Sequence, residues 1–295
     1  MHEIGAKHIL TPYGENNMWF GLNYNMNIYR GCCHGCIYCD SRSACYNVEN
    51  FDEVRIKKDA LAVLERDLRS FAHKGVIGTG SMTDHYNPFE KDMRITRGAL
   101  ELIDKYGFGI NITTKSDIVA RDKDILLKIS GHSPSSVTFT VTTINEELCK
   151  KIEPNAPTAA ARLAALKKLT DLEIVCGVIL TPILPFINDT EDNISGILEE
   201  AARAGAKYAF TFHGFGVTLR QNQRDYFFDK LDALFPGTKR KYIHAFGNAY
   251  SCSSPNNAVL KKIFTERCRA LGLKCEMNDI VALMRERYGS QMRMF

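Results

Sequence analysis

Short apolar runs alternate with amphipathic stretches along most of the first 218 residues, and this alternation constrains the fold more than any other feature. In the amphipathic stretches, apolar residues recur every three or four positions, which is the pattern of a helix with one buried face. Repeated strand–helix units of this length predict a parallel sheet, either open or rolled into a barrel. The runs of strand type after residue 70 cover 76–78, 110–115, 137–142, 174–180 and 208–213.

Three of these runs alternate apolar and polar residues, whereas strands covered by helices on both faces usually read as continuous apolar runs. Because successive side chains of a strand point to opposite faces, each of the three has one apolar face and one small, polar face. We expect the apolar face to pack against helices and the polar face to line a wet lumen. On this pattern the lumen side includes Lys115, Thr140 and His213, and the helix side includes Tyr208, Phe210 and Phe212.

About six strands of this kind are present, fewer than the eight of a closed TIM barrel. The sequence therefore predicts an α/β fold, a partial (β/α)6 TIM-type barrel whose carboxyl strand ends carry the site. The pattern changes after residue 218, so we expect a barrel over 1–218 and a helical C-terminal extension over 219–295 that packs on it. Within the extension we expect helices at 221–235 and 260–272, and irregular or extended chain at 239–250.

The composition excludes few classes of function. Hydrophobic residues make up 45% of the 295 residues and charged residues 24%, which is ordinary for a globular protein. The net charge of +4 is too small to argue for nucleic acid by itself, and it does not exclude nucleic acid. No apolar run approaches the roughly 20 residues that span a bilayer, and the N-terminus has no secretory pattern. We therefore expect a cytoplasmic protein without a membrane partner.

Five of the ten cysteines lie between residues 32 and 45, and such clustering points to a metal or redox site rather than to disulfides. Cys32, Cys36 and Cys39 form a C-x3-C-x2-C loop after the first strand, and three thiolates can hold three irons of a cubane cluster. The fourth iron is left open for a small molecule to bind directly. A zinc site, with His34 or Cys33 as the fourth ligand, is the alternative.

The cysteine loop, with Tyr38 as the aromatic residue before its last cysteine, resembles the signature of radical S-adenosylmethionine (SAM) enzymes. The resemblance implies a [4Fe–4S] cluster on Cys32, Cys36 and Cys39, whose open iron binds the amino and carboxylate groups of S-adenosyl-L-methionine. It also implies a reductant such as flavodoxin or ferredoxin, whose electron cleaves SAM to methionine and a 5′-deoxyadenosyl radical. That radical takes a hydrogen atom from a substrate, so an enzyme of lyase or transferase type is implied.

Other segments resemble the spore-photolyase-like branch of this family over roughly residues 20–215. These segments are 29–42, 83–90, 113–122 and 152–154. By position, the resemblance implies that Ser81, Lys115 and Thr140 contact the polar groups of SAM. It implies equally that Tyr38 borders the adenine. The strand alternation independently assigns Lys115 and Thr140 to the lumen. Beyond the cluster ligands, no catalytic residue is assigned.

Two positions depart from the spore photolyase pattern. Gly80 stands where that enzyme has a hydrogen-donating cysteine, and Asp40 stands where it has a tyrosine after the last cluster cysteine. These departures predict that the chain does not repair the spore-specific thymine dimer and acts on another substrate. The alternatives are a nucleic-acid lyase or repair enzyme close to spore photolyase, and a non-catalytic iron–sulfur or zinc protein.

Several residues allow two interpretations. We interpret Arg162 as a solvated charge on a helix, with a contact to the SAM carboxylate as the alternative. Cys45 is expected to be an ordinary thiol, with a hydrogen donor or a sensor thiol as the alternative. Cys252, Cys268 and Cys275 are expected to be buried structural cysteines, with an auxiliary cluster as the alternative.

Overall fold

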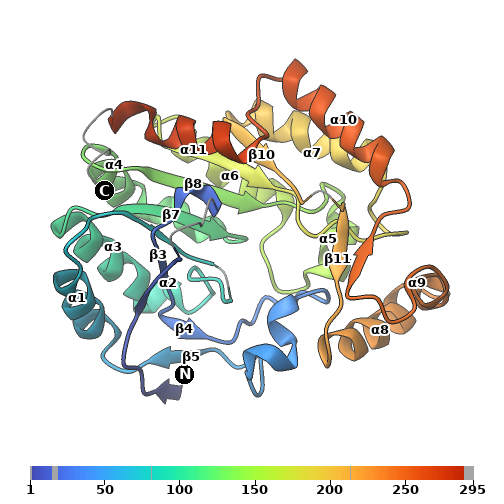
Figure 1. Cartoon of the computed structure of the whole chain (residues 1–295), viewed down its shortest axis with the longest axis horizontal. Helices are drawn as coiled ribbons and strands as arrows, with labels where there is room; N and C mark the ends of the chain where they lie inside the picture. Colours follow the sequence, from blue (N-terminus) through green and yellow to red (C-terminus); the bar gives the residue numbers. More distant parts are fainter. Residues whose placement is uncertain (1, 15–18, 81, 213, 289–295) are drawn as a thin grey trace.

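Seven strands form the central sheet of the computed structural model, which describes residues 2–14, 19–80, 82–212 and 214–288 (Figure 1). They lie in the order β10-β9-β8-β7-β6-β3-β2; the six from β10 to β3 are parallel, and β2 is antiparallel to β3. Six parallel strands in an unclosed order make a partial (β/α)6 barrel, so the predicted fold class is confirmed. The strands are β2 (Leu10–Pro12), β3 (Tyr24–Met26), β6 (Val76–Gly78), β7 (Gly109–Thr114), β8 (Ser135–Thr140), β9 (Val175–Ile179) and β10 (Tyr208–Phe210).

Two smaller sheets flank this one, a three-stranded sheet in the order β1-β5-β4 and an antiparallel pair β11-β12. Their strands are β1 (His2–Ile4), β4 (Tyr29–Arg30), β5 (Arg55–Lys57), β11 (Gly216–Thr218) and β12 (Ser251–Ser253). The α-helices of the described ranges are α1 (Ala60–Ser70), α2 (Glu90–Met93), α3 (Ile95–Lys105), α4 (Lys123–Ser130), α5 (Glu146–Ile152), α6 (Ala159–Thr170), α7 (Glu191–Arg203), α8 (Gln223–Leu234), α9 (Thr238–Phe246), α10 (Asn257–Ala270) and α11 (Met277–Arg285). Short 3-10 helices are η1 (Trp19–Gly21), η2 (Asp40–Arg42), η3 (Ala44–Tyr46) and η4 (Asp117–Asp122).

Helices α5, α6 and α7 begin at side chains that cap free backbone N–H groups. Asn145, Thr158 and Thr190 each accept a hydrogen bond from the backbone N–H three residues further on. A cap of this kind stabilises a helix by about 1 kcal/mol. Gly107 and Gly205 follow α3 and α7 with φ of +71° and +91°, a conformation in which a residue with a side chain would be strained.

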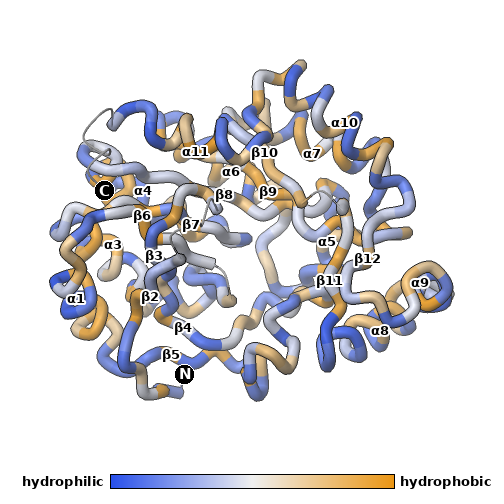
Figure 2. Tube along the Cα trace, viewed as in Figure 1, coloured by the Kyte–Doolittle hydropathy of each residue, from blue (hydrophilic) through white to orange (hydrophobic). Residues whose placement is uncertain are grey.

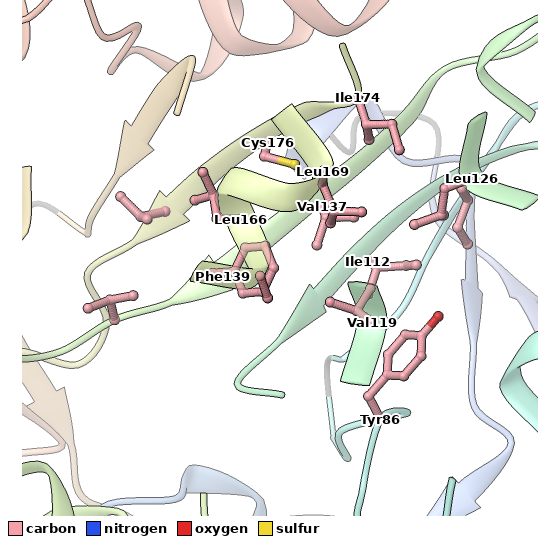
Figure 3. Packing of buried hydrophobic residues seen from close by; sticks show 14 of the residues in the cluster. Tyr86, Ile112, Val119, Leu126, Val137, Phe139, Leu166, Leu169, Ile174 and Cys176 are labelled. Atoms are coloured by element: carbon pink, nitrogen blue, oxygen red, sulfur yellow. The ribbon is translucent and has the colours of Figure 1, made fainter. Parts of the chain in front are cut away.

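The outer face of the sheet packs against helix α6 in one apolar core (Figure 3). Val137 and Phe139 of β8 are fully buried there. Cys176 of β9 lies in the same core, together with Leu166 and Leu169 of α6. Each such side chain removed from water contributes about 1.5–3 kcal/mol. The apolar face of β8 therefore turns toward the helices, as the alternation predicts.

Strand β10 reverses the orientation that the alternation predicts. The hydroxyl of Tyr208 lies 2.6 Å from the hydroxyl of Thr138, which belongs to the polar face of β8. Ala209, on the opposite face of β10, lies in the outer core. The expectation that Tyr208, Phe210 and Phe212 pack on helices is therefore wrong. These rings are apolar, but they face the lumen because aromatic residues from η1 fill it beside them.

An apolar plug fills the lumen near the amino ends of the strands. Phe20 of η1 packs on Tyr208 and Phe210, with ring centroids 6.0 and 5.8 Å apart. Met284 of α11 reaches the same space, and the hydroxyl of Ser136 lies 3.7 Å from its sulfur. Side chains from both ends of the chain thus close one end of the lumen. Space for a ligand is left at the carboxyl ends of the strands.

The C-terminal region is mostly helical, as predicted, and strand pairing joins it to the barrel. Strand β11 ends at the predicted boundary and pairs with β12, and α10 packs on α7 (Figure 1). The division into 1–218 and 219–295 stays a prediction. The expectation of irregular chain at 239–250 is wrong, because α9 covers most of it and buries Tyr242. The basic residues before Tyr242 make this segment look solvent-exposed in the sequence, so its buried face was not predicted.

Hydrophilic and hydrophobic residues alternate along the outer helices, as expected for helices with one buried face (Figure 2). Within the described ranges, none of the helices combines the length and the apolar composition that crossing a bilayer requires.

Candidate functional site

A cavity of about 650 Å³ lies at the carboxyl ends of the parallel strands. All the predicted cluster and SAM residues that the structure describes line it, namely Cys32, Cys36, Tyr38, Cys39, Lys115 and Thr140. Lys115 and Thr140 therefore point into the lumen, as the alternation predicts. Ser81 and His213 were also singled out, and both lie outside the described residues. The structure thus brings together, around one space, residues that come from the cysteine loop and from the ends of two strands.

Backbone hydrogen bonds and a glycine shape the cysteine loop. The N–H of Cys32 donates to the carbonyl of Phe51 (2.8 Å), and the N–H of Ile37 donates to the carbonyl of Ile152 (3.0 Å). Gly31 has a φ of +81° and lies so close to the backbone before β5 that a Cβ atom would clash. The loop is therefore held from two sides, by the chain before β5 and by the end of α5.

Burial governs the protonation of the three loop thiols. Together with the Asp84 carboxylate, burial raises the pKa of Cys32 to about 12, and burial also raises the pKa of Cys36 and of Cys39. The Lys115 ammonium acts in the opposite direction on Cys36 and Cys39, because a nearby cation favours the thiolate. Metals bind thiolates, so protons must leave these thiols when a metal cluster binds.

A buried ion pair that the sequence did not reveal supports the wall beside the loop. Arg162 of α6 and Glu153, which follows α5, are paired and almost fully buried. Glu153 also accepts hydrogen bonds from the hydroxyls of Tyr38 and Thr142, and Arg162 donates to the carbonyl of Thr140 (2.9 Å). The interpretation of Arg162 as a solvated helix charge is therefore wrong. The periodicity of a helix does not show that a charged residue is buried when its ion-pair partner lies outside the helix.

Asp84 ties the loop after β6 to the end of β7. Its carboxylate accepts hydrogen bonds from the hydroxyl of Thr114 and from the backbone N–H of Lys115, both at 2.8 Å. Burial acts to raise the pKa of Asp84, but His34 and these hydrogen bonds lower it overall. His34, named above as an alternative zinc ligand, is buried with its Nδ1 3.6 Å from this carboxylate. In the described part of the chain, no three His, Cys, Asp or Glu side chains surround a single point that one ion could occupy.

A second ion pair lies where the cavity opens to solvent. Asp40, directly after the last loop cysteine, has its Oδ1 3.3 Å from Nε of Arg220. Asp40 also accepts hydrogen bonds from the hydroxyls of Thr218 (3.2 Å) and Tyr46 (3.1 Å). Arg220 donates in turn to the hydroxyl oxygen of Tyr250 (2.8 Å). Asp40, Thr218 and Tyr250 line the cavity, so the pair shapes its entrance.

The cysteines outside the loop are dispersed. Cys45 is exposed, and its sulfur accepts a hydrogen bond from Arg220 (3.0 Å). Cys252 and Cys268 are fully buried in different apolar clusters, which confirms the expectation of buried residues for these two. Cys275 is half-buried beside Cys268. The three do not share one environment.

Gly80 marks a close approach between β6 and β7. Its φ is +85°, and a Cβ atom there would clash with the carbonyl oxygen of Thr113. A residue with a side chain therefore requires movement of the strand end at this position.

Comparison with known proteins agrees with this geometry. A family model described as the radical SAM superfamily matches residues 26–215. An uncharacterised protein of Methanocaldococcus jannaschii is 37% identical over 174 residues, which are 58% of this chain and 64% of the relative. An uncharacterised protein of Mycobacterium tuberculosis is 28% identical over 248 residues, 82% of this chain and 72% of the relative.

Among solved structures, a variant of spore photoproduct lyase superposes with a TM-score of 0.68 over 92% of this chain and 80% of that chain. Its sequence identity is 14%, so this likeness is one of fold. The family match covers the cysteine loop and the parallel strands from β6 to β10. The chain therefore belongs to the radical SAM superfamily.

Proposed function

We propose that this chain binds a [4Fe–4S] cluster and SAM in the cavity, cleaves SAM reductively, and abstracts a hydrogen atom from a substrate other than spore photoproduct. The radical SAM superfamily uses these two cofactors, and the residues of the cavity fit both. The observation that carries the proposal is that three thiols and an ammonium group line the same space. They belong to Cys32, Cys36, Cys39 and Lys115.

In this proposal Cys32, Cys36 and Cys39 hold three irons and leave the fourth open to SAM. When bound, the cluster supplies the electron that cleaves SAM to methionine and a 5′-deoxyadenosyl radical. The protein contributes a loop whose backbone is fixed on both sides, and the buried pair of Glu153 and Arg162 lies behind Tyr38 and Thr140 of the cavity wall. Groups held in this way can keep a reactive intermediate in one orientation.

The SAM contacts are proposed from the residues beside the thiols. The Lys115 ammonium is suited to the SAM carboxylate, and the Thr140 hydroxyl to a polar group next to it. Tyr38, held by its hydrogen bond to Glu153, borders the adenine. Ser81, the residue after Gly80 in the sequence, is the proposed third polar contact.

The electron comes from outside the chain. We propose a small reductant such as flavodoxin or ferredoxin and a cytoplasmic location. The absence of disulfides among all ten cysteines supports a reducing compartment.

A second candidate is a nucleic-acid lyase or repair enzyme, which the fold shared with spore photoproduct lyase favours. Gly80 and Asp40 argue against the repair of spore photoproduct itself. The test is to incubate reconstituted protein, SAM and dithionite with a dinucleotide spore photoproduct and to follow thymidine by chromatography. We expect no repaired dinucleotide, and multiple turnovers would overturn this part of the proposal.

The test of the leading proposal compares two neighbouring cysteines. After anaerobic reconstitution, Cys36→Ala should lose the bound iron, the brown colour and the formation of 5′-deoxyadenosine from SAM and dithionite. Cys33→Ala, which changes a thiol beside the ligands, should keep all three. A Cys33→Ala protein without iron would show that the ligands are misassigned, and a colourless wild-type protein with one zinc would support the zinc alternative.

A further inference from the structure

The entrance of the cavity carries side chains that the proposed function does not use. We call it the mouth and define it by five lining residues that are partly or largely exposed: Trp19, Asp40, Phe212, Thr218 and Tyr250. We propose that the mouth binds a planar nitrogen heterocycle that is neutral or cationic. The inference rests on the proposed function in taking this ring as the part of the substrate that approaches SAM.

Trp19 and Phe212 form the aromatic side of the mouth. Their rings are parallel to within 4°, with centroids 5.4 Å apart. Phe210 supports both edge-on, at 5.4 Å from Trp19 and 5.6 Å from Phe212. Phe212 is nevertheless 53% exposed, so aromatic surface is left for a ligand. Flat rings stack on such a platform with little dependence on their substituents.

Asp40 and Tyr250 form the polar side. The hydroxyl oxygen of Tyr250 accepts a hydrogen bond from Arg220, so its own hydrogen is available to an acceptor on the ligand. Asp40 accepts from Thr218 and Tyr46 and lies against Arg220. A carboxylate has about four lone-pair sites, so one is left for a donor on the ligand. An acceptor and a donor together match the edge of a nitrogen heterocycle.

The charge at the mouth sets the sign of the ligand. Asp40 lines the cavity, whereas Arg220 is engaged by Asp40 and Tyr250 at its side. The other charged residues along the described wall, Asp84 and Lys115, come from the inner end with the thiols. A phosphate close to the ring would therefore meet a carboxylate, and like charges repel. A free base or nucleoside fits the mouth better than a nucleotide.

The test uses guanosine as the probe, because its edge carries a donor beside an acceptor, and guanosine 5′-monophosphate as the matched anion. Binding is measured by calorimetry on the reconstituted full chain with SAM present. We expect guanosine to bind more tightly than the monophosphate. Asp40→Asn should weaken guanosine binding by about tenfold, because it removes a hydrogen bond to a charged group. It should also reduce the difference in affinity between guanosine and the monophosphate. Asp52→Asn is the control, because Asp52 is an exposed carboxylate paired with Arg42 outside the described wall.

Two further measurements keep the test independent of the Asp40 variant. Tyr250→Phe removes one neutral hydrogen bond and should weaken guanosine by roughly threefold. Guanosine should also quench the emission of Trp19, which is the chain's single tryptophan. Equal affinity for the two probes, or unchanged guanosine binding by both variants, would overturn the inference.

Formation of 5′-deoxyadenosine in the same samples separates this inference from the proposed function. Cleavage of SAM without binding of guanosine overturns the inference and leaves the function standing. Binding of guanosine without cleavage of SAM supports the mouth as a site and overturns the function.

Discussion

Two ion pairs support the wall of one cavity, and they differ chiefly in their access to water. Glu153 and Arg162, at the inner end, have side chains that are 0% and 1% exposed. Asp40 and Arg220, at the mouth, have side chains that are 31% and 35% exposed. A buried charge must be satisfied by protein groups on every side, whereas an exposed charge can exchange a partner for water or a ligand.

This difference separates two tasks. The inner pair binds the Tyr38 hydroxyl and the Thr140 carbonyl, so it holds the loop and the end of β8 in one arrangement. The mouth pair is partly exposed, so water or a ligand can reach the Asp40 carboxylate. Rigidity at the inner end suits cofactors shared by a whole family, and adaptability at the mouth suits a substrate that differs between members.

Breaking the inner pair should have the largest effect on stability. Glu153→Ala leaves the Arg162 guanidinium buried without its counter-ion, and we expect a loss of about 3–5 kcal/mol in the free energy of unfolding. Urea denaturation followed by circular dichroism measures it. Glu147→Ala is the matched control, because Glu147 lies on α5 in an exposed pair with Lys150 (2.9 Å) and its removal should leave the urea midpoint unchanged. Equal midpoints for the two variants would contradict the distinction between the pairs.

Acid should destabilise the segment before the cysteine loop through the buried side chain of His85. Burial lowers the pKa of His85 from 6.5 to about 4, and its Nε2 accepts a hydrogen bond from the N–H of Ile28 before the cysteine loop. The unfolded chain binds a proton on His85 more readily than the folded chain does. The contribution of His85 to the free energy of unfolding is therefore fully present above pH 6.5, and about 3 kcal/mol of it is lost as the pH drops toward 4.

The check is urea denaturation across that pH window. His85→Gln should reduce the loss of unfolding free energy between pH 6.5 and 4. His132→Gln, at a partly exposed histidine, should not reduce it. Parallel curves for wild type and His85→Gln would show that other groups cause the acid sensitivity.

The mouth pair should give the smallest effect on stability. Arg220→Gln removes the cation from Asp40, but water can replace it at this exposure. We expect the urea midpoint to stay within error and the bound iron to be retained. A midpoint shift as large as that of Glu153→Ala would mean that the mouth is as rigid as the inner end.

The sequence predicted the parts of the site that follow from local pattern. Strand alternation assigned Lys115 and Thr140 to the lumen, and the cysteine spacing predicted one loop that carries three thiols. Alternation failed in β10 because period 2 shows which residues share a face but not which face is inward. There the rings of Tyr208 and Phe210 found aromatic partners from η1, far away in the sequence.

The sequence did not predict the pair of Glu153 and Arg162, for a related reason. A charged residue on a helix reads as solvated unless its partner is known, and the partner of Arg162 precedes the helix. The available signal was Glu153 in the segment 152–154, which the family resemblance marked without assigning a role. Pairing between separate segments is a property of the fold, and a single sequence does not encode it in any local period.

Gly80 limits which side chains this position can accept. Its φ is +85°, and a Cβ atom built there would lie too close to the carbonyl oxygen of Thr113. A cysteine introduced at this position would therefore meet backbone atoms, and it would fit only together with a second change that moves the end of β7. An engineer who wants a thiol beside the loop cysteines must redesign two segments of backbone, not one side chain.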